Sequence, residues 1–230
     1  MASWILPNLA GIVFLSLLAP VDWAVIESNK MTNSEEPHIV RLTPRHNVME
    51  HGKDLYFRIP QRYFNFRGPP NGGHIDAITT VLMFPDFRPA SRLEMSDPLN
   101  NNNIIFVTLI NAVSPNNNLV SNMINHTIGG LIKNGRMITI KNDPSHKQYE
   151  EIRGNGDKSG QKYSIHDDNG DYFVVICRDR QCRMLALNYK NNNISYRIIF
   201  NESHELEYAR IKQGVNKFVD GIYIEELGNQ

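Results

Sequence analysis

The stretch KYSIHDDNGDYFVVICRDRQCRMLALNYKNNNISYRIIF, residues 162–200, decides the fold of this chain. It holds short runs rich in β-branched and aromatic residues, separated by turn-forming residues, which is the pattern of β-strands. The dipeptide Asn169-Gly170 favours a tight hairpin, because a primed two-residue turn needs positive φ angles. Connections this short join strands that pair antiparallel. The stretch therefore predicts a four-stranded antiparallel meander, with strands at Lys162–Ile165, Tyr172–Cys177, Cys182–Tyr189 and Ile194–Phe200.

The only two cysteines of the chain, Cys177 and Cys182, flank the connection between the second and third of these strands. A four-residue loop between antiparallel strands places the flanking residues opposite each other, within reach of a disulfide. A zinc site is disfavoured, because a single pair of cysteines lacks the second ligand pair at a suitable spacing. We therefore predict a disulfide that fixes the register of the hairpin. Such a bond also favours an oxidising compartment.

The segment after the meander predicts an amphipathic helix, because its apolar residues recur at alternating spacings of three and four. Ser203 is the expected N-cap, since a hydroxyl there can accept a hydrogen bond from the first turn. The apolar stripe needs an apolar surface to cover, and one face of the meander supplies it. The predicted fold class is therefore α+β, an antiparallel sheet packed by a C-terminal amphipathic helix. The stripe consists of Tyr208, Ile211, Val215, Phe218 and Ile222.

Upstream of the meander, residues 37–161 show further short strand-like runs separated by turn signals. A short helix is predicted over Asn118–Lys133, although Gly129-Gly130 weakens it. Together with the meander these elements predict a single α+β domain over residues 37–230. The upstream strands are predicted at His38–Leu42, Leu55–Ile59, Ile75–Phe84, Ile104–Leu109 and Arg136–Lys141.

Residues 1–24 are predicted to be a signal peptide or an N-terminal anchor. No charged residue occurs from Met1 to Val21, and the apolar core at Ala10–Leu18 has the length of a signal-peptide core rather than of a membrane span. No Lys or Arg precedes this core, which leaves both alternatives open. Residues 25–36 are polar and lack periodicity, so they are predicted to form a flexible linker. Together with the disulfide, this segment predicts an exported, periplasmic protein.

The charge of the chain is balanced, with 24 Lys+Arg against 24 Asp+Glu. Binding to nucleic acid or to anionic lipid needs a basic excess, so neither is an expected partner, and no membrane contact is expected beyond an N-terminal anchor. A neutral protein must find its partner through local charged patches, such as the arginines at 58, 62 and 67.

No motif for catalysis, cofactor binding or metal binding stands out. His74 could act as a general base held by Asp76, but nothing nearby supplies a nucleophile. The run from Asp167 to Asp171 begins like a calcium-binding loop, yet Tyr172 stands where the loop needs a glycine. The eight histidines are scattered, which is typical of surface positions. We therefore predict that the protein is not an enzyme and has no catalytic residue, cofactor or metal.

Residues 58–67, RIPQRYFNFR, combine arginines with aromatic residues. Before Pro60 the alternation of a strand predicts Leu55, Phe57 and Ile59 on the core side and Arg58 towards water. Aromatic residues and arginine are over-represented in protein interfaces. The segment is therefore the predicted surface for a protein partner, with contacts from Arg58, Arg62, Tyr63, Phe64, Phe66 and Arg67.

Two stretches carry a family resemblance, DLYFRIPQRYF at residues 54–64 and IDAITTVLMFPDFRP at residues 75–89. Followed by a cysteine hairpin, a closing strand and a C-terminal helix, they resemble small exported proteins of Gram-negative bacteria. Many of those look like immunity partners of type VI secretion effectors. The resemblance implies a periplasmic immunity protein that binds an antibacterial toxin and occludes its active site. It implies no particular binding residues, because such partners vary with the toxin that they fit.

Two other functions stay open at the level of sequence. The first is an envelope structural or accessory protein without a toxin partner. The second is a hydrolase with a dispersed active site, for which His74 and Asp76 would have to converge on a deep pocket.

Overall fold

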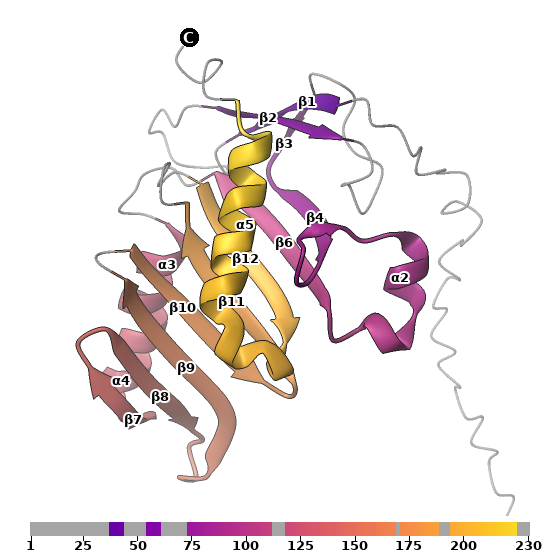
Figure 1. Cartoon of the computed structure of the whole chain (residues 1–230). Helices are drawn as coiled ribbons and strands as arrows, with labels where there is room; N and C mark the ends of the chain where they lie inside the picture. The colour runs from indigo at the N-terminus through magenta and orange to yellow at the C-terminus, as the bar shows by residue number, and fades with distance from the viewer. Residues whose placement is uncertain are drawn as a thin grey trace, which may run out of the picture. The chain divides into compact units, whose positions relative to one another are not determined.

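A long antiparallel sheet forms the centre of the described structure (Figure 1). The computed structural model describes residues 37–43, 54–60, 73–111, 118–168, 171–188 and 194–224. These residues all belong to one unit, Met31–Gln230, whereas the predicted N-terminal segment and linker lie outside the described residues. The strands of the sheet are β4 (Ile78–Met83), β5 (Arg88–Pro89), β6 (Ile104–Asn111), β7 (Met137–Asp143), β8 (His146–Ile152), β9 (Lys158–Asp168), β10 (Asp171–Arg178), β11 (Gln181–Leu187) and β12 (Ile194–Asn201).

Within the described ranges this sheet has nine strands in the order β5-β4-β6-β12-β11-β10-β9-β8-β7. A smaller sheet holds β1 (Pro37–Leu42), β2 (Leu55–Pro60) and β3 (His74–Ile75) in the order β2-β1-β3. In the smaller sheet β1 pairs antiparallel with β2 and parallel with β3. The α+β class predicted from the sequence is confirmed.

The predicted meander is also confirmed, because β9, β10, β11 and β12 pair in succession and antiparallel. Cys177 lies opposite Cys182 with their Cα atoms 4.1 Å apart, and the two form the predicted disulfide. The connection between them is tighter than the four-residue loop that the spacing predicted. Arg178 pairs with Gln181, and the two-residue turn between them has φ angles of 51° at Asp179 and 67° at Arg180. Positive φ at both central residues is the mark of a type I′ turn, whose twist matches that of the flanking strands.

The structure differs from the predicted strands in two places. The polar strand β8 was not predicted at all, because its sequence HKQYEEI lacks the apolar alternation of a half-buried strand. The run predicted as one strand over Ile75–Phe84 breaks at Asp76, and its two parts, β3 and β4, belong to different sheets.

The C-terminal helix α5 (Tyr208–Ile222) covers one face of the long sheet and contacts the small sheet (Figure 1). Its side chains Ile211, Val215 and Val219 are fully buried, and burial of each such side chain stabilises the fold by about 1.5–3 kcal/mol. The predicted N-cap at Ser203 was wrong. Residues Glu202–Glu207 form a 3-10 segment, η4, in which the Asn201 side chain accepts a hydrogen bond from the Ser203 N–H at 2.9 Å.

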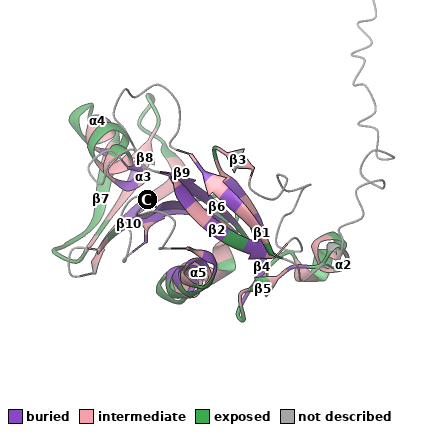
Figure 2. Cartoon of the chain, turned by 90° about the horizontal axis from the view of Figure 1, so that it is seen from above, coloured by how far each residue is buried: buried purple, intermediate pink, exposed green. Residues whose placement is uncertain are grey.

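The opposite face of the sheet is covered by the predicted helix near residues 118–133 (Figure 2). It consists of α3 (Leu119–Asn122), the π-helical η3 (Met123–Ile128) and α4 (Gly129–Lys133), and the Asn118 side chain caps its first turn. Beneath it lies a second apolar cluster that includes Val174, whereas its strand neighbours Phe173 and Val175 face α5. None of the described helices combines the length and the hydrophobicity that a transmembrane span requires.

Candidate functional site

A groove lies between α5, the end of β2 and the turn that joins β4 to β5. Its volume is about 570 Å³, within the range of roughly 300–1,000 Å³ that ligand pockets occupy. Arg58 and Pro60 line it from β2, Phe87 from the turn, and Gly214, Lys217 and Gly221 from α5.

The alternation of β2 places Arg58 at this groove. Phe57 and Ile59 are buried on the core side, so the side chain between them, Arg58, is exposed on the other side, as the sequence predicted. The chain after α5 holds this wall against the helix, because the Ile224 N–H donates to the Tyr56 carbonyl at 2.9 Å. Phe57 also packs on Tyr223, with ring centroids 5.6 Å apart. The two walls of the groove are therefore joined by backbone and ring contacts.

Phe87 forms one end of the groove and lies directly on the backbone of α5. A Cβ atom at Gly214 would stand 2.1 Å from Phe87 Cε2, so only glycine leaves room for this ring. Phe87 has a φ of 57°, its N–H donates to the Met83 carbonyl at 2.7 Å, and its ring meets Phe84 edge-on at 5.9 Å. The turn thus places the ring of Phe87 against the helix backbone at Gly214, in the space that a side chain would otherwise fill. We call such a space at a glycine a notch.

Gly221 offers a second notch on the same side of α5, since seven residues are about two helical turns. Apart from the helix's own backbone, no described residue comes within 4 Å of the position that a Cβ would take there, and Gly221 is exposed. The groove therefore contains one notch filled by Phe87 and a second, at the exposed Gly221, that no described residue fills.

The groove carries an excess of positive charge. Arg58 and Lys217 are exposed, and neither has an ion-pair partner among the described residues. The carboxylate of Asp86, which also lines the groove, is 3.2 Å from Nε of Arg88 and is thereby partly neutralised.

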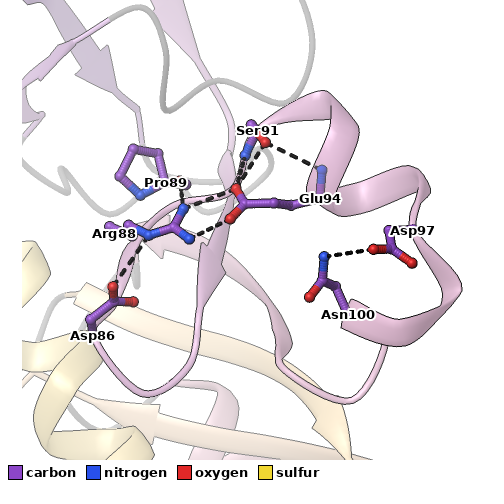
Figure 3. Close-up of polar contacts among 7 residues, drawn as sticks. All are labelled: Asp86, Arg88, Pro89, Ser91, Glu94, Asp97 and Asn100. Carbon is purple, nitrogen blue, oxygen red and sulfur yellow. Dashed lines mark hydrogen bonds and ion pairs between the residues drawn. The ribbon is translucent and has the colours of Figure 1, made fainter.

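Arg88 connects the groove to the short helix α2 (Arg92–Ser96), as Figure 3 shows. Its guanidinium donates two hydrogen bonds to Glu94, of which the one from Nη1 to Oε2 is 2.9 Å long. The N–H and hydroxyl of Ser91 also donate to Glu94, at 2.9 and 2.8 Å. The hydrogen bonds from Arg88 and then from Ser91 lower the pKa of Glu94 to about 2. This capped helix holds the turn that carries Asp86 and Phe87.

Of the six residues predicted to bind a partner, the structure describes Arg58. The other five, Arg62, Tyr63, Phe64, Phe66 and Arg67, lie outside the described residues, so their role stays a prediction. The side chain of His74 also lies outside the description, and Asp76 accepts a long hydrogen bond of 3.4 Å from the Thr43 hydroxyl. Among the described residues, no three metal-binding side chains gather.

The histidines are not all scattered on the surface, contrary to the prediction. Pairing of β8 with β9 sets His146 opposite His166, and their rings stack at 4.3 Å. The ring of His166 also meets Phe173 at 4.6 Å and Tyr208 at 4.2 Å. Burial, with a smaller contribution from neighbouring His146 and Lys141, lowers the pKa of His166 to about 4, so it is neutral and packs as an aromatic ring. No signal in the sequence could align these residues, because β8 itself carries no strand pattern.

A second buried feature lies beside this cluster. Lys212 of α5, which is 6% exposed, donates to the carboxylate of Asp171, and its ammonium lies 5.1 Å from the centre of the Phe173 ring. The pair ties the helix to the first residue of β10.

Comparison with known proteins finds similarity in structure but not in sequence. The chain matches no model of a known protein family and no curated protein at a significant level. It is similar to Smlt3025, an immunity protein of the Stenotrophomonas maltophilia type IV secretion system, with a TM-score of 0.54 and 12% identity over 84% of this chain and 95% of that one. The iron-regulated outer membrane lipoprotein FrpD of Neisseria meningitidis gives a TM-score of 0.45 and 12% identity over 81% of this chain and 95% of its own.

At this identity the likeness to Smlt3025 shows a shared fold, and the likeness to FrpD is too weak to support an inference. This chain therefore shares the fold of Smlt3025. That protein belongs to a type IV system, whereas the resemblance in sequence implied type VI.

Proposed function

We propose that this protein is a periplasmic immunity protein that binds a secreted antibacterial toxin and occludes the active site of that toxin. The observation that carries the proposal is the groove beside Arg58, in which no described residue fills the notch at Gly221 or pairs with Arg58 and Lys217. The groove adjoins Pro60, after which the chain continues into the segment predicted to bind a partner. Recognition by an aromatic- and arginine-rich surface suits a protein partner rather than a small substrate.

Two further observations support the proposal. The fold is similar to that of the immunity protein Smlt3025 over 84% of this chain and 95% of that one. The disulfide between Cys177 and Cys182 fits an oxidising compartment and thus agrees with export through residues 1–24. On this proposal residues 37–230 act as a single binding domain, without a catalytic residue, a cofactor or a metal, and the toxin is delivered by a type VI secretion system.

The proposal is tested with the secreted effector encoded beside this protein in its genome. Cells that direct the effector to their periplasm should survive when the full chain is co-expressed, and the two purified proteins should form a stable complex. A matched chain that lacks residues 1–24 should stay in the cytoplasm and fail to protect. If the full chain neither binds nor protects, the protein is not an immunity factor for that effector. An envelope structural protein or a hydrolase would give this negative result.

A further inference from the structure

We infer that the groove receives a protein segment in which an apolar side chain, seated over Gly221, is flanked by carboxylates that pair with Arg58 and Lys217. This inference rests on the proposed function and deepens it by naming the chemistry of the partner segment. Its basis is the shape and the charge of the groove.

The shape of the site follows from the two glycines of α5. At Gly214 the chain itself shows what such a notch accepts, because the ring of Phe87 lies against the helix there with no space for a Cβ. At Gly221 the same helix surface is exposed, and no described residue outside the helix backbone comes within 4 Å of a Cβ position. An apolar side chain from outside could contact the helix backbone there as Phe87 does two turns earlier. A large apolar side chain seated in a desolvated pocket is the usual anchor of a protein interface.

The positive charge of the groove favours a partner segment with acidic residues on both sides of that apolar side chain. Arg58 reaches the groove from β2 and Lys217 from α5, so they stand on opposite walls. Neither has an ion-pair partner in the part of the chain that the structure describes, whereas the acidic Asp86 is engaged by Arg88. A segment with carboxylates on both sides of its anchor would pair with both cations. Charge pairs of this kind raise association rates and reject partners of the wrong sign.

Other kinds of occupant fit the site less well. The net charge of zero and a patch of two cations do not suit nucleic acid or an anionic membrane, which need many phosphate contacts. A volume of about 570 Å³ holds an apolar side chain together with its flanking backbone, rather than a folded element. An acidic loop of a partner protein fits both the charge and the volume of the groove.

The experiment uses three fluorescein-labelled peptides and the full-length protein, with binding followed by fluorescence anisotropy at low salt. The probes are Asp-Glu-Leu-Glu-Asp, its charge-reversed form Lys-Arg-Leu-Arg-Lys, and its anchorless form Asp-Glu-Gly-Glu-Asp. We expect the first to bind at least about tenfold more tightly than either of the others. Equal binding of all three, or no binding of the first at millimolar concentration, would overturn the inference.

Variants of the protein locate the binding. Gly221→Leu fills the open notch and should weaken the acidic peptide by about tenfold or more, whereas Ala209→Leu, at an exposed position of the same helix outside the groove, should not. Lys217→Glu should weaken it as well, whereas Arg183→Glu, which changes the net charge equally but lines a different pocket, should leave it unchanged. Thermal unfolding of each variant shows that it folds. Loss of binding in both control variants as well would place the peptide outside the groove and refute the inference.

The protection assay separates this inference from the proposed function. If Gly221→Leu and Lys217→Glu still protect cells fully, the toxin binds elsewhere, and only the assignment of the groove is wrong. If the unaltered protein fails to protect while the acidic peptide binds as expected, the immunity function is wrong and the groove assignment stands. If the peptide binds only to a Phe64→Ser/Phe66→Ser double variant, the chain's own segment occupies the groove, and the inference is overturned.

Discussion

The two glycines of α5 should respond in opposite ways to the same substitution. Alanine is favoured over glycine within a helix by up to about 1 kcal/mol. At Gly221 no described residue outside the helix backbone lies within 4 Å of the new methyl group. Gly221→Ala should therefore stabilise the protein by about 0.5 kcal/mol, a value below the maximum because Gly221 lies in the last turn. At Gly214 the methyl group would stand 2.1 Å from the ring of Phe87, far inside the normal separation of roughly 3.5–4.0 Å.

The structure sets the size of the effect at Gly214. Overpacking costs about 1–3 kcal/mol, and the partly buried ring of Phe87 must move from its contact with Phe84 to admit the methyl group. After subtraction of the gain in helix propensity, Gly214→Ala should lower the free energy of unfolding by about 1–2 kcal/mol. The corresponding fall in Tm is about 2–8 °C for a protein of this size.

The assay is urea unfolding of the full chain, followed by far-UV circular dichroism. A third variant isolates the cause, because in a Phe87→Ala background the overlap is gone and Gly214→Ala should become stabilising. If Gly214→Ala stabilises the unaltered protein as much as Gly221→Ala does, then Phe87 does not lie on the helix, and the description of the groove is wrong.

Three further predictions concern buried contacts. The pKa of His166, about 4, lies below its unfolded value near 6.5, because burial disfavours the charged ring. The contribution of His166 to the free energy of unfolding should therefore be full above pH 6.5 and decrease as the pH falls towards 4. Urea titrations over this pH range should show a smaller decrease for a His166→Phe variant. Replacing Cys177 and Cys182 by Ala should lower the free energy of unfolding by at most about 2 kcal/mol, because the closed loop is short. A reducing agent should lower the free energy of unfolding of the unaltered protein equally and should not change that of the variant. Asp171→Asn leaves the buried ammonium of Lys212 unpaired and should lower the free energy of unfolding by about 2–3 kcal/mol, less than for a fully buried pair because Asp171 is partly exposed. Adding Lys212→Met should recover most of this free energy. Equal instability of the single and double variants would contradict the prediction.

Most of the predicted elements exist because their signals are local. The meander, the cysteine pair and α5 each depend on residues that lie close together in the sequence, where turn chemistry and apolar spacing act directly. The N-cap at Ser203 failed although it is also a local signal. A 3-10 segment capped by Asn201 precedes the helix, and the capping role passed to a neighbour two residues away.

The strands were predicted less well where their partners, and not their own residues, decide the structure. β8 forms because β7 and β9 pair with its two edges, so a polar sequence suffices. The break at Asp76 arises because β3 pairs with β1 while β4 pairs with β6. Such pairings depend on contacts between segments far apart in the chain, which propensity does not report.

The amino-acid sequence by itself determined the α+β class, the disulfide hairpin, the C-terminal helix and the exposure of Arg58. These follow from periodicity and turn chemistry over a few residues. Only the tertiary structure decided the groove, because its walls come from β2, from the turn at Phe87 and from α5, more than a hundred residues apart between the first and the last. Gly214 shows the difference: in the sequence it is a weak point of a helix, and in the fold it is the space that Phe87 fills.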